Sequence, residues 1–353
     1  MALSLALLAV LLVALSAPAR SDAQYGPGPP GFFGVNASGF EPGDFDLMAA
    51  SNIGVTRNVF PFQVLKHGKR KPFSWGYSDP IVRATAQAGI DLVPMVYGSP
   101  PWVSEKLNHT VLKGESKRAW DDLLVALVDR YGPEGSFWSA PENEYVPYRP
   151  IRIWQIWNEP NSITWWGPKP NPREYGKVLV RSAKILHAED PGSQVMSAGV
   201  VARPTNKHAI PGKKYLSKLL QSRAVVEATD IIAYHPFAES VNGVRKQLKV
   251  ARKAINRRGA ADIPIWITEI GWGSKGPKNQ SLVKSPAAQD RTLRDVMMMA
   301  IDEQGPLNLG RLLWYQWRDT PSDLCKWCET SGLLNIHSKP KQLLATFASI
   351  ANR

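Results

Sequence analysis

Short apolar runs alternate along this chain with longer segments in which apolar residues recur every three or four positions. The short runs are rich in Val, Ile, Trp and Phe, which is typical of β-strands, and the longer segments have the period of helices. The clearest helical segments are 44–53, 116–131, 172–190 and 286–304. The predicted strands are 32–36, 55–60, 91–98, 151–159, 194–201, 230–237, 263–272 and 310–317.

Regular alternation of strands and helices predicts a parallel sheet with helical crossovers, and continuous apolar strands indicate a sheet buried on both faces. Eight such units within 32–353 predict an α/β fold, a single-domain (β/α)8 TIM barrel. A doubly wound open sheet is the structural alternative. It usually carries a glycine-rich phosphate turn after its first strand, and the sequence at 34–40, "GVNASGF", lacks that pattern. The segment 132–150 is predicted as an insertion before the fourth strand.

The first residues differ from the rest of the chain. An apolar run at 3–17 is followed by small residues, which predicts a signal peptide at 1–23 and a secreted protein. A Pro/Gly-rich linker is predicted at 24–31. The alternative is a membrane anchor, although the run is shorter than the ~20 residues that span a bilayer. No comparable apolar run follows, so we expect no stable membrane span after the signal is removed.

Of the 353 residues 44% are hydrophobic and 21% charged, which is ordinary for a folded soluble protein. The formal net charge of +13 favours contact with anionic polymers. The positive charge is scattered, however, and its one dense cluster is "KHGKRK" at 66–71. Because no nucleic-acid-reading element accompanies that cluster, we expect no nucleic-acid partner. An acidic or cell-wall-associated glycan is the partner that this charge favours.

The two cysteines, Cys325 and Cys328, are predicted to form a disulfide that closes a tight loop, as expected in a secreted protein. A thioredoxin-like redox pair would need a strand-to-helix start in a reducing compartment, and a zinc site would need a second ligand pair.

Two predicted strands end in a glutamate. Glu159 follows Ile153, Gln155 and Trp157 in "IWQIWNEPN", and Glu269 follows Ile265 and Ile267 in "IPIWITEIGW". If side chains alternate regularly, both acids project into the barrel with these residues. The strands are the fourth and seventh, on nearly opposite sides of the barrel, and barrel enzymes use the C-terminal ends of their strands as the active site. The alternative is two unrelated glutamates that cap the helices after their strands.

A carboxylate pair across a cleft is what glycosidic bond cleavage requires. One acid donates a proton to the leaving oxygen, while the other attacks the anomeric carbon or activates water. Apolar and aromatic neighbours raise the pKa of a carboxyl group, which suits the proton donor.

The motifs "WNEPN" and "WITEIGW" resemble the fourth- and seventh-strand signatures of the clan A glycoside hydrolases, retaining β/α barrels, with families 5 and 39 the nearest in motif. The resemblance implies that Glu159 is the acid/base, that Glu269 is the nucleophile and that Asn158 binds the 2-hydroxyl of the sugar. It implies neither a metal nor an organic cofactor.

Three further positions fit this template. Arg57 on the second strand can hold the nucleophile ionised, unless it faces solvent at a strand edge. His235 ends the sixth strand, where similar clan members carry a histidine within the site; the alternative is a satisfied core histidine. Trp317 ends the eighth strand, where relatives have an aromatic platform for the sugar, or it packs at the barrel rim.

One departure concerns the sixth strand, where many relatives read H-x-Y and this chain reads His235-Pro236-Phe237. Tyr234 or Tyr315 are the candidates to supply the missing hydroxyl.

The chain is also rich in tryptophan, and indole rings bind the apolar faces of sugars. Trp102 and Trp272 are predicted to bind substrate, within a set of tryptophans at strand ends and in the following loops. The whole set is Trp75, Trp102, Trp165, Trp166, Trp272 and Trp317.

The sequence thus predicts a secreted retaining glycosidase that cleaves a β-linked oligo- or polysaccharide. An inactive glycan-binding barrel at the cell surface and a transglycosylase with the same acid pair remain open. Sugar and linkage specificity, endo or exo action and oligomeric state are not determined by these motifs.

Overall fold

The computed structural model describes residues 31–109, 113–277, 279–323 and 325–351. The predicted signal peptide and all but the last residue of the predicted linker lie outside these ranges, so both stay predictions. Within these ranges, none of the helices is both long and apolar enough to cross a membrane.

One parallel sheet forms the centre of the molecule, in the strand order β5-β4-β3-β2-β1-β9-β8-β7-β6. Its strands are β1 (Phe33–Asn36), β2 (Val55–Pro61), β3 (Asp91–Tyr97), β4 (Ile153–Ile156), β5 (Gln194–Met196), β6 (Val200–Val201), β7 (Ile232–His235), β8 (Ile265–Ile270) and β9 (Leu309–Tyr315).

The two outer strands of this order, β5 and β6, are consecutive parts of the run 194–201. β5 pairs with β4, and β6 pairs with β7. A bridge between Met196 and Ile231 joins the lower part of the run to the chain entering β7. The sheet therefore closes on itself, and the run acts as the fifth of eight barrel strands. The predicted (β/α)8 barrel is confirmed.

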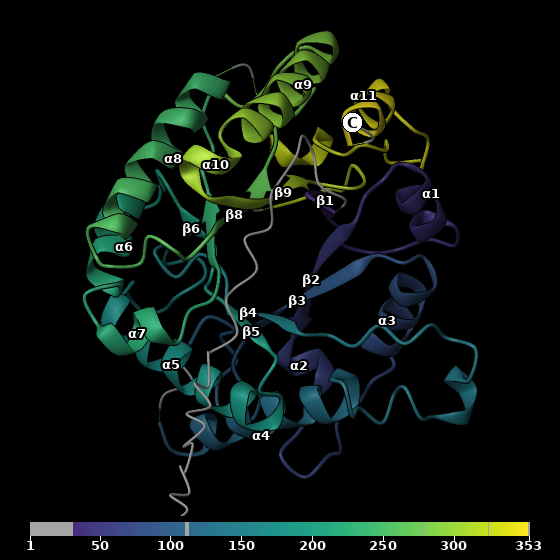
Figure 1. Ribbon diagram of the computed structural model, residues 1–353, viewed down its shortest axis with the longest axis vertical. Helices are drawn as coiled ribbons and strands as arrows, with labels where there is room; N and C mark the ends of the chain where they lie inside the picture. The colour runs from purple at the N-terminus through teal and green to yellow at the C-terminus, as the bar shows by residue number, and fades with distance from the viewer. Residues whose placement is uncertain (1–30, 110–112, 278, 324, 352–353) are drawn as a thin grey trace, which may run out of the picture.

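Helices surround this barrel (Figure 1). The predicted helical segments are confirmed with small shifts at their ends: 44–53 is α1, 116–131 is α4, 172–190 is α5 and 286–304 is α9. The helices are α1 (Asp44–Ala50), α2 (Phe62–Leu65), α3 (Ser78–Gln87), α4 (Gly114–Tyr131), α5 (Pro172–Glu189), α6 (Gly212–Leu219), α7 (Arg223–Glu227), α8 (Val241–Asn256), α9 (Pro286–Asp302), α10 (Gln304–Leu307) and α11 (Gln342–Ala351), with short 3-10 turns at Pro141–Asn143 and Cys328–Thr330.

Local sequence explains where the long helices begin. Asn171 caps α5, because its side-chain oxygen accepts hydrogen bonds from the backbone N–H groups of Arg173 and Glu174. Pro172 occupies the first turn, where its missing N–H costs nothing. Ser285 and Pro286 start α9 in the same way. Caps of this kind fix where each helix leaves its loop.

The barrel interior is apolar at its lower end. Here a cluster of buried side chains from strands around the barrel forms the barrel floor. It is separate from the core that lies between the strands and the helices, and we call it the apolar layer. It consists of Val55, Val93, Met196, Ile231, Ala233, Trp266 and Leu313.

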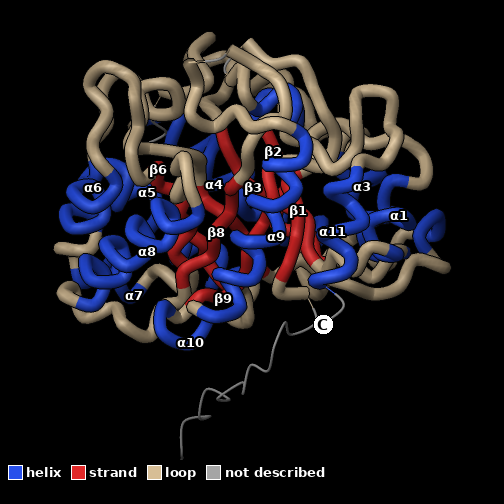
Figure 2. The backbone as a smooth tube through the Cα atoms, turned by 90° about the horizontal axis from the view of Figure 1, so that it is seen from above, coloured by secondary structure: helices blue, strands red, loops and turns tan. Residues whose placement is uncertain are grey.

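Long loops gather at one end of the strands (Figure 2). The segments that follow β4, β8 and β9 are the connections at the C-terminal ends of the strands, where barrel enzymes carry their sites.

Candidate active site

Arg57 occupies the centre of the barrel mouth, one inward position above Val55 on β2. Its side chain is 4% exposed. Its Nη1 donates to Glu269 Oε1 at 2.7 Å and to Asn36 Oδ1 at 2.8 Å, and its Nη2 donates to Asn158 Oδ1 at 2.8 Å. Its Nε donates to Gln155 Oε1. The solvent-facing alternative for Arg57 is therefore wrong: the guanidinium binds side chains from β1, from β4 and the residues after it, and from β8.

Glu269 reaches the interior by a route that regular alternation does not predict. Trp266 belongs to the inward apolar layer, whereas Ile265 and Ile267 pack outward against the helices. Ile267 pairs with Leu312 and Ile270 pairs with Trp314, so three steps along β8 match two steps along β9. This β-bulge re-aims the extra residue. The expectation that Glu269 shares a face with Ile265 and Ile267 is wrong, and the bulge turns the acid inward.

Glu159 is placed by a second irregularity, at the end of β4. Gln155 faces inward, but Trp157 points outward, against Trp120 and Trp166. Both Trp157 (φ 75°) and Glu159 (φ 36°) have left-handed backbone, which is uncommon for residues other than glycine and clusters at functional sites. The expectation that Trp157 faces inward with Glu159 is wrong, because the left-handed backbone separates their directions.

His235 joins the two acids. It ends β7, one inward position above Ala233, and its side chain is fully buried. Its Nδ1 lies 2.8 Å from Glu159 Oε1, and its Nε2 lies 3.0 Å from Thr268 Oγ1. Oxygen atoms of Glu159 and Glu269 and a ring nitrogen of His235 all lie within 4.8 Å of one another. The two glutamates are therefore close together at the same end of the barrel.

The two groups of the His235–Glu159 pair have opposite pKa shifts. Burial raises the pKa of Glu159 to about 7, against the positive charge of Arg57 and a hydrogen bond from Trp165. Burial lowers the pKa of His235 to about 4, a change that the charge of Glu269 opposes and that of Arg57 reinforces. Near neutral pH the ring is therefore uncharged, and Glu159 can still carry a proton.

The proton shared between Glu159 and His235 can lie on either the carboxyl group or the Nδ1 atom. When Glu159 is ionised, the Nδ1–H of His235 donates to it and Nε2 accepts from the Thr268 hydroxyl. When Glu159 is protonated, its own O–H donates to Nδ1, and Nε2–H donates to Thr268. The hydroxyl of Thr268 serves both states because it can donate or accept.

Glu159, His235 and Glu269 are also close enough together for their side chains to hold a metal ion. The surrounding contacts do not fit one. Glu269 Oε1 already accepts from the Arg57 guanidinium, and both ring nitrogens of His235 have hydrogen-bond partners. An added cation would face a positive charge 2.7 Å from its ligand. We assign no metal here.

A cavity of about 650 Å³ opens above these residues. Another hollow of about 600 Å³, beside α5, has five Lys and Arg side chains and no acid among its described lining residues, so it lacks the required pair. Side chains from several loops and strand ends line the larger cavity. They include Asn36, Arg57, Asn158, Glu159, Trp165, Arg203, Asn206, Phe237, Glu269, Tyr315 and Trp327.

The predicted tryptophan platforms do not lie where the sequence suggested. Trp317 and Trp272 are almost completely buried and do not line the cavity. Trp102 is half-buried against Phe62 and also lies outside the lining. The prediction that these three rings form the cavity wall is wrong, because their indoles fill the packing around the barrel.

Trp165 does line the cavity, but Trp166 is buried and Trp75 stacks on Phe73 outside the lining. The sequence reasoning missed Trp327, the aromatic residue between the two cysteines. Its position inside the predicted disulfide loop was the available signal.

The departure from H-x-Y has a structural counterpart. Phe237 lines the cavity without a hydroxyl. Tyr315 also lines it, and burial together with the charges of Glu269 and Glu159 raises its pKa above the usual value. Tyr234 is buried and lies outside the lining. Of the two candidates for the missing hydroxyl, Tyr315 is the one near the acids.

Cys325 and Cys328 are joined by a disulfide, as predicted, and both cysteines line the cavity.

Comparison with known proteins shows the fold of the chain. No protein-family model and no curated protein sequence matches the chain. Among solved structures, a family 39 glycoside hydrolase from Bacteroides cellulosilyticus WH2 superposes with a TM-score of 0.67 at 17% identity, over 91% of this chain and 63% of that one. The chain has the barrel fold of the glycoside hydrolases.

Two further structures support this fold. A GH39 β-xylosidase from Caulobacter crescentus has a TM-score of 0.61 at 17% identity, over 94% of this chain and 73% of that one. A family 51 α-L-arabinofuranosidase from Bifidobacterium longum has a TM-score of 0.61 at 16% identity, over 89% of this chain and 67% of that one. The chain spans 63% to 73% of the length of these three proteins.

Proposed function

We propose that the protein is a secreted retaining glycosidase that hydrolyses a β-linked oligo- or polysaccharide, with Glu159 as acid/base and Glu269 as nucleophile. One observation carries the proposal: two carboxyl groups with oxygens within 4.8 Å of each other have different surroundings. Glu159 has its pKa raised to about 7 by burial, whereas Glu269 is paired with Arg57. Different environments for two carboxyl groups are how one site holds both an acid and a base.

The reaction proceeds in two displacements. An oxygen of Glu269 bonds to the anomeric carbon while the glycosidic C–O bond breaks, and the proton of Glu159 passes to the leaving oxygen. Glu159, now ionised, takes a proton from water, whose oxygen bonds to the anomeric carbon and releases Glu269. A close carboxyl pair, roughly 5–5.5 Å apart, suits this route, because the inverting route needs a wider gap that holds a water between the carboxylate base and the sugar.

Neighbouring groups support these roles. Arg57 donates to Glu269 and Asn158 at once, so it orients the nucleophile and the amide proposed to bind the sugar 2-hydroxyl. His235 holds Glu159 from beneath the cavity. Among the similar structures, one is named a β-xylosidase and another an α-L-arabinofuranosidase. Because these two names include one β-glycosidase and one α-glycosidase, the β-linkage in our proposal rests on the sequence motifs. Secretion rests on the apolar run at 3–17.

Azide can test the roles of the two acids separately. We would prepare Glu269→Ala, Glu159→Ala and a matched control, Glu303→Ala, whose buried glutamate pairs with Arg245 outside the cavity lining. The substrates are 2,4-dinitrophenyl β-glycosides of xylose, glucose and mannose, whose leaving group needs no proton.

Glu269→Ala should lose turnover by about 10⁴-fold or more. Azide should restore turnover of this variant and yield the α-glycosyl azide, because the small anion takes the nucleophile's place. Glu159→Ala with azide should yield the β-glycosyl azide, and Glu303→Ala should resemble wild type and form no azide product. Full activity in Glu269→Ala, or azide products of swapped stereochemistry, would contradict the assignment. Product analysis with xylo-oligosaccharides separates hydrolysis from transglycosylation, and a pure glycan binder would turn over none of these substrates.

A further inference from the structure

The disulfide loop stands in the wall of the active-site cavity. Cys325, Trp327 and Cys328 all line it. Of these, Trp327 has the largest apolar surface, and its side chain is only partly buried. The loop follows β9, so it lies at the C-terminal end of the barrel with the carboxyl pair.

Aromatic rings support Trp327 from the strand ends. Its ring centre lies 5.3 Å from that of Phe237 at an interplanar angle of 65°, an edge-to-face contact. It lies 6.4 Å from the ring centre of Tyr315. Phe237 in turn packs on His235, with 5.9 Å between ring centres. Trp327 is therefore fixed above the β7–β9 side of the cavity, the side that carries Glu269.

Close backbone packing holds the loop in this position. A Cβ atom at Gly273 would lie 2.1 Å from the backbone oxygen of Trp327, so only glycine allows this approach. The side-chain amide of Gln316 donates to the carbonyl oxygen of Cys328 at 3.2 Å. The disulfide closes the loop across three residue steps.

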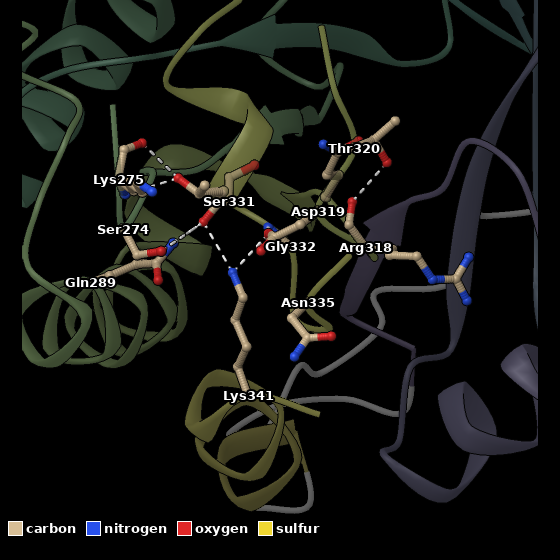
Figure 3. A network of polar contacts seen from close by, with 12 residues as sticks. Ser274, Lys275, Gln289, Arg318, Asp319, Thr320, Ser331, Gly332, Asn335 and Lys341 are labelled. Atoms are coloured by element: carbon tan, nitrogen blue, oxygen red, sulfur yellow. Dashed lines mark hydrogen bonds and ion pairs between the residues drawn. The ribbon is translucent and has the colours of Figure 1, made fainter. Parts of the chain in front are cut away.

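A polar network anchors the chain just after the loop. Lys341 Nζ donates to the Thr330 carbonyl oxygen at 3.1 Å and to Asp319 Oδ1 at 2.7 Å. The same carbonyl accepts from Gln289 Nε2 at 2.9 Å. Figure 3 shows the side chain of Lys341, the residue just before α11, reaching up toward Gly332 and Asp319. The loop is thus held at Trp327 and on its C-terminal side before any ligand arrives, which reduces the ordering cost of binding.

We propose that Trp327, held by the Cys325–Cys328 disulfide, is the platform on which a sugar ring stacks on the Glu269 side of the cavity. Trp327 thus serves as the aromatic platform that the sequence predicted at Trp317, whose ring is buried. The platform rests on the proposed function for its place in catalysis, but stacking itself requires only that a glycan binds in the cavity. The apolar C–H face of a pyranose is the chemistry that a flat indole recognises.

The first test is kinetic, with 4-nitrophenyl β-D-xylopyranoside, β-D-glucopyranoside and β-D-mannopyranoside as probes. Trp327→Ala should raise KM for the hydrolysed probe by about tenfold, with a smaller change in kcat. Trp327→Phe should recover part of this loss, because a flat ring remains. The matched control is Trp138→Ala: Trp138 is also half-buried, but it lies in the 132–150 segment outside the cavity lining.

The second test removes the disulfide. Cys325→Ser with Cys328→Ser should raise KM in the wild-type background and add little in the Trp327→Ala background, because both changes act through one ring. A merely structural disulfide would affect both backgrounds equally, and that result would overturn the proposal. Unchanged KM in Trp327→Ala would do the same.

Binding separates this inference from the proposed function. If wild type hydrolyses none of the probes, calorimetry with xylohexaose, cellohexaose and mannohexaose decides the platform alone. Weaker binding by Trp327→Ala than by wild type then supports it. Equal binding, or no binding by wild type, overturns it.

Discussion

The barrel interior has two neighbouring layers, two residues apart along the strands, and one is apolar whereas the other is polar and charged. The apolar layer contains Val55 and Ala233, and the layer above contains Arg57 and His235. We call that upper set the polar layer. It consists of Asn36, Arg57, Gln155, Asn158, Glu159, His235, Thr268 and Glu269.

The difference shows what each layer does for the other. The apolar layer keeps water from the barrel floor, so the groups above it lie in a medium of low polarizability, where ionic hydrogen bonds are strong and unpaired charges are costly. In the polar layer the buried charge of Arg57 is therefore paired, because its guanidinium donates hydrogen bonds to four side chains. The enzyme's activity should therefore survive the loss of two methyl groups from the floor, whereas the polar layer should not tolerate the loss of a hydrogen-bond partner.

The largest expected effect comes from Arg57→Met. The buried Glu269 loses its ion pair and three amide oxygens lose a donor, so the free energy of unfolding should fall by about 3–5 kcal/mol. Turnover of a dinitrophenyl glycoside should be nearly lost. Val55→Ala is the matched change one inward position below, and should cost about 2 kcal/mol while leaving kcat/KM within about threefold. Urea unfolding and steady-state kinetics check both. Equal effects of the two substitutions on kcat/KM would contradict the contrast between the layers.

A smaller effect is expected from Gly199→Ala. A Cβ there would lie 2.0 Å from His235 Nε2, so the ring must move and its contact with Glu159 must change. We expect overpacking to lower the free energy of unfolding by about 1–3 kcal/mol and kcat/KM to fall about 100-fold. Gly305→Ala, with no neighbouring atom within 4 Å of its added Cβ, is the control and should change neither quantity appreciably. If the two alanines behave alike, close packing of Gly199 on the histidine is not what positions Glu159.

The smallest effect is a change in how stability depends on pH. The pKa of Glu159 rises from 4.5 to about 7 on folding, so its contribution is complete below pH 4.5 and is lost as pH rises through 7. The pKa of His235 falls from 6.5 to about 4, so its contribution is complete above pH 6.5 and is lost as pH falls through 4. Between pH 4.5 and 6.5 the two slopes oppose each other.

Glu159→Gln should remove one slope and leave the other. Relative to wild type, its free energy of unfolding should fall by up to about 1.4 kcal/mol for each unit of pH lowered between 6.5 and 4.5. Urea unfolding of both proteins at half-unit pH steps measures this difference. Curves that stay parallel across that range would show that Glu159 does not titrate as its burial implies.

Much of this arrangement follows from local sequence. Period-two alternation places Arg57 above Val55 and His235 above Ala233, as the structure has them. Apolar strands between amphipathic helices predicted the closed barrel, because a sheet that is apolar on both faces needs helices outside and a filled interior. The sequence also identified the acids Glu159 and Glu269, because each is a charged residue at the end of an apolar run.

The tertiary structure decided how those acids and the aromatic wall are presented. The left-handed backbone at Trp157 turns that ring outward while Glu159 stays inward, and the bulge in β8 turns Glu269 inward although it directly follows the inward Thr268. Such irregularities persist only because surrounding contacts hold them. The choice of Trp327 over Trp317 as the exposed indole likewise depends on which ring the packed barrel buries. Short-range pattern fixed which residues stand at the strand ends, whereas long-range packing set their directions.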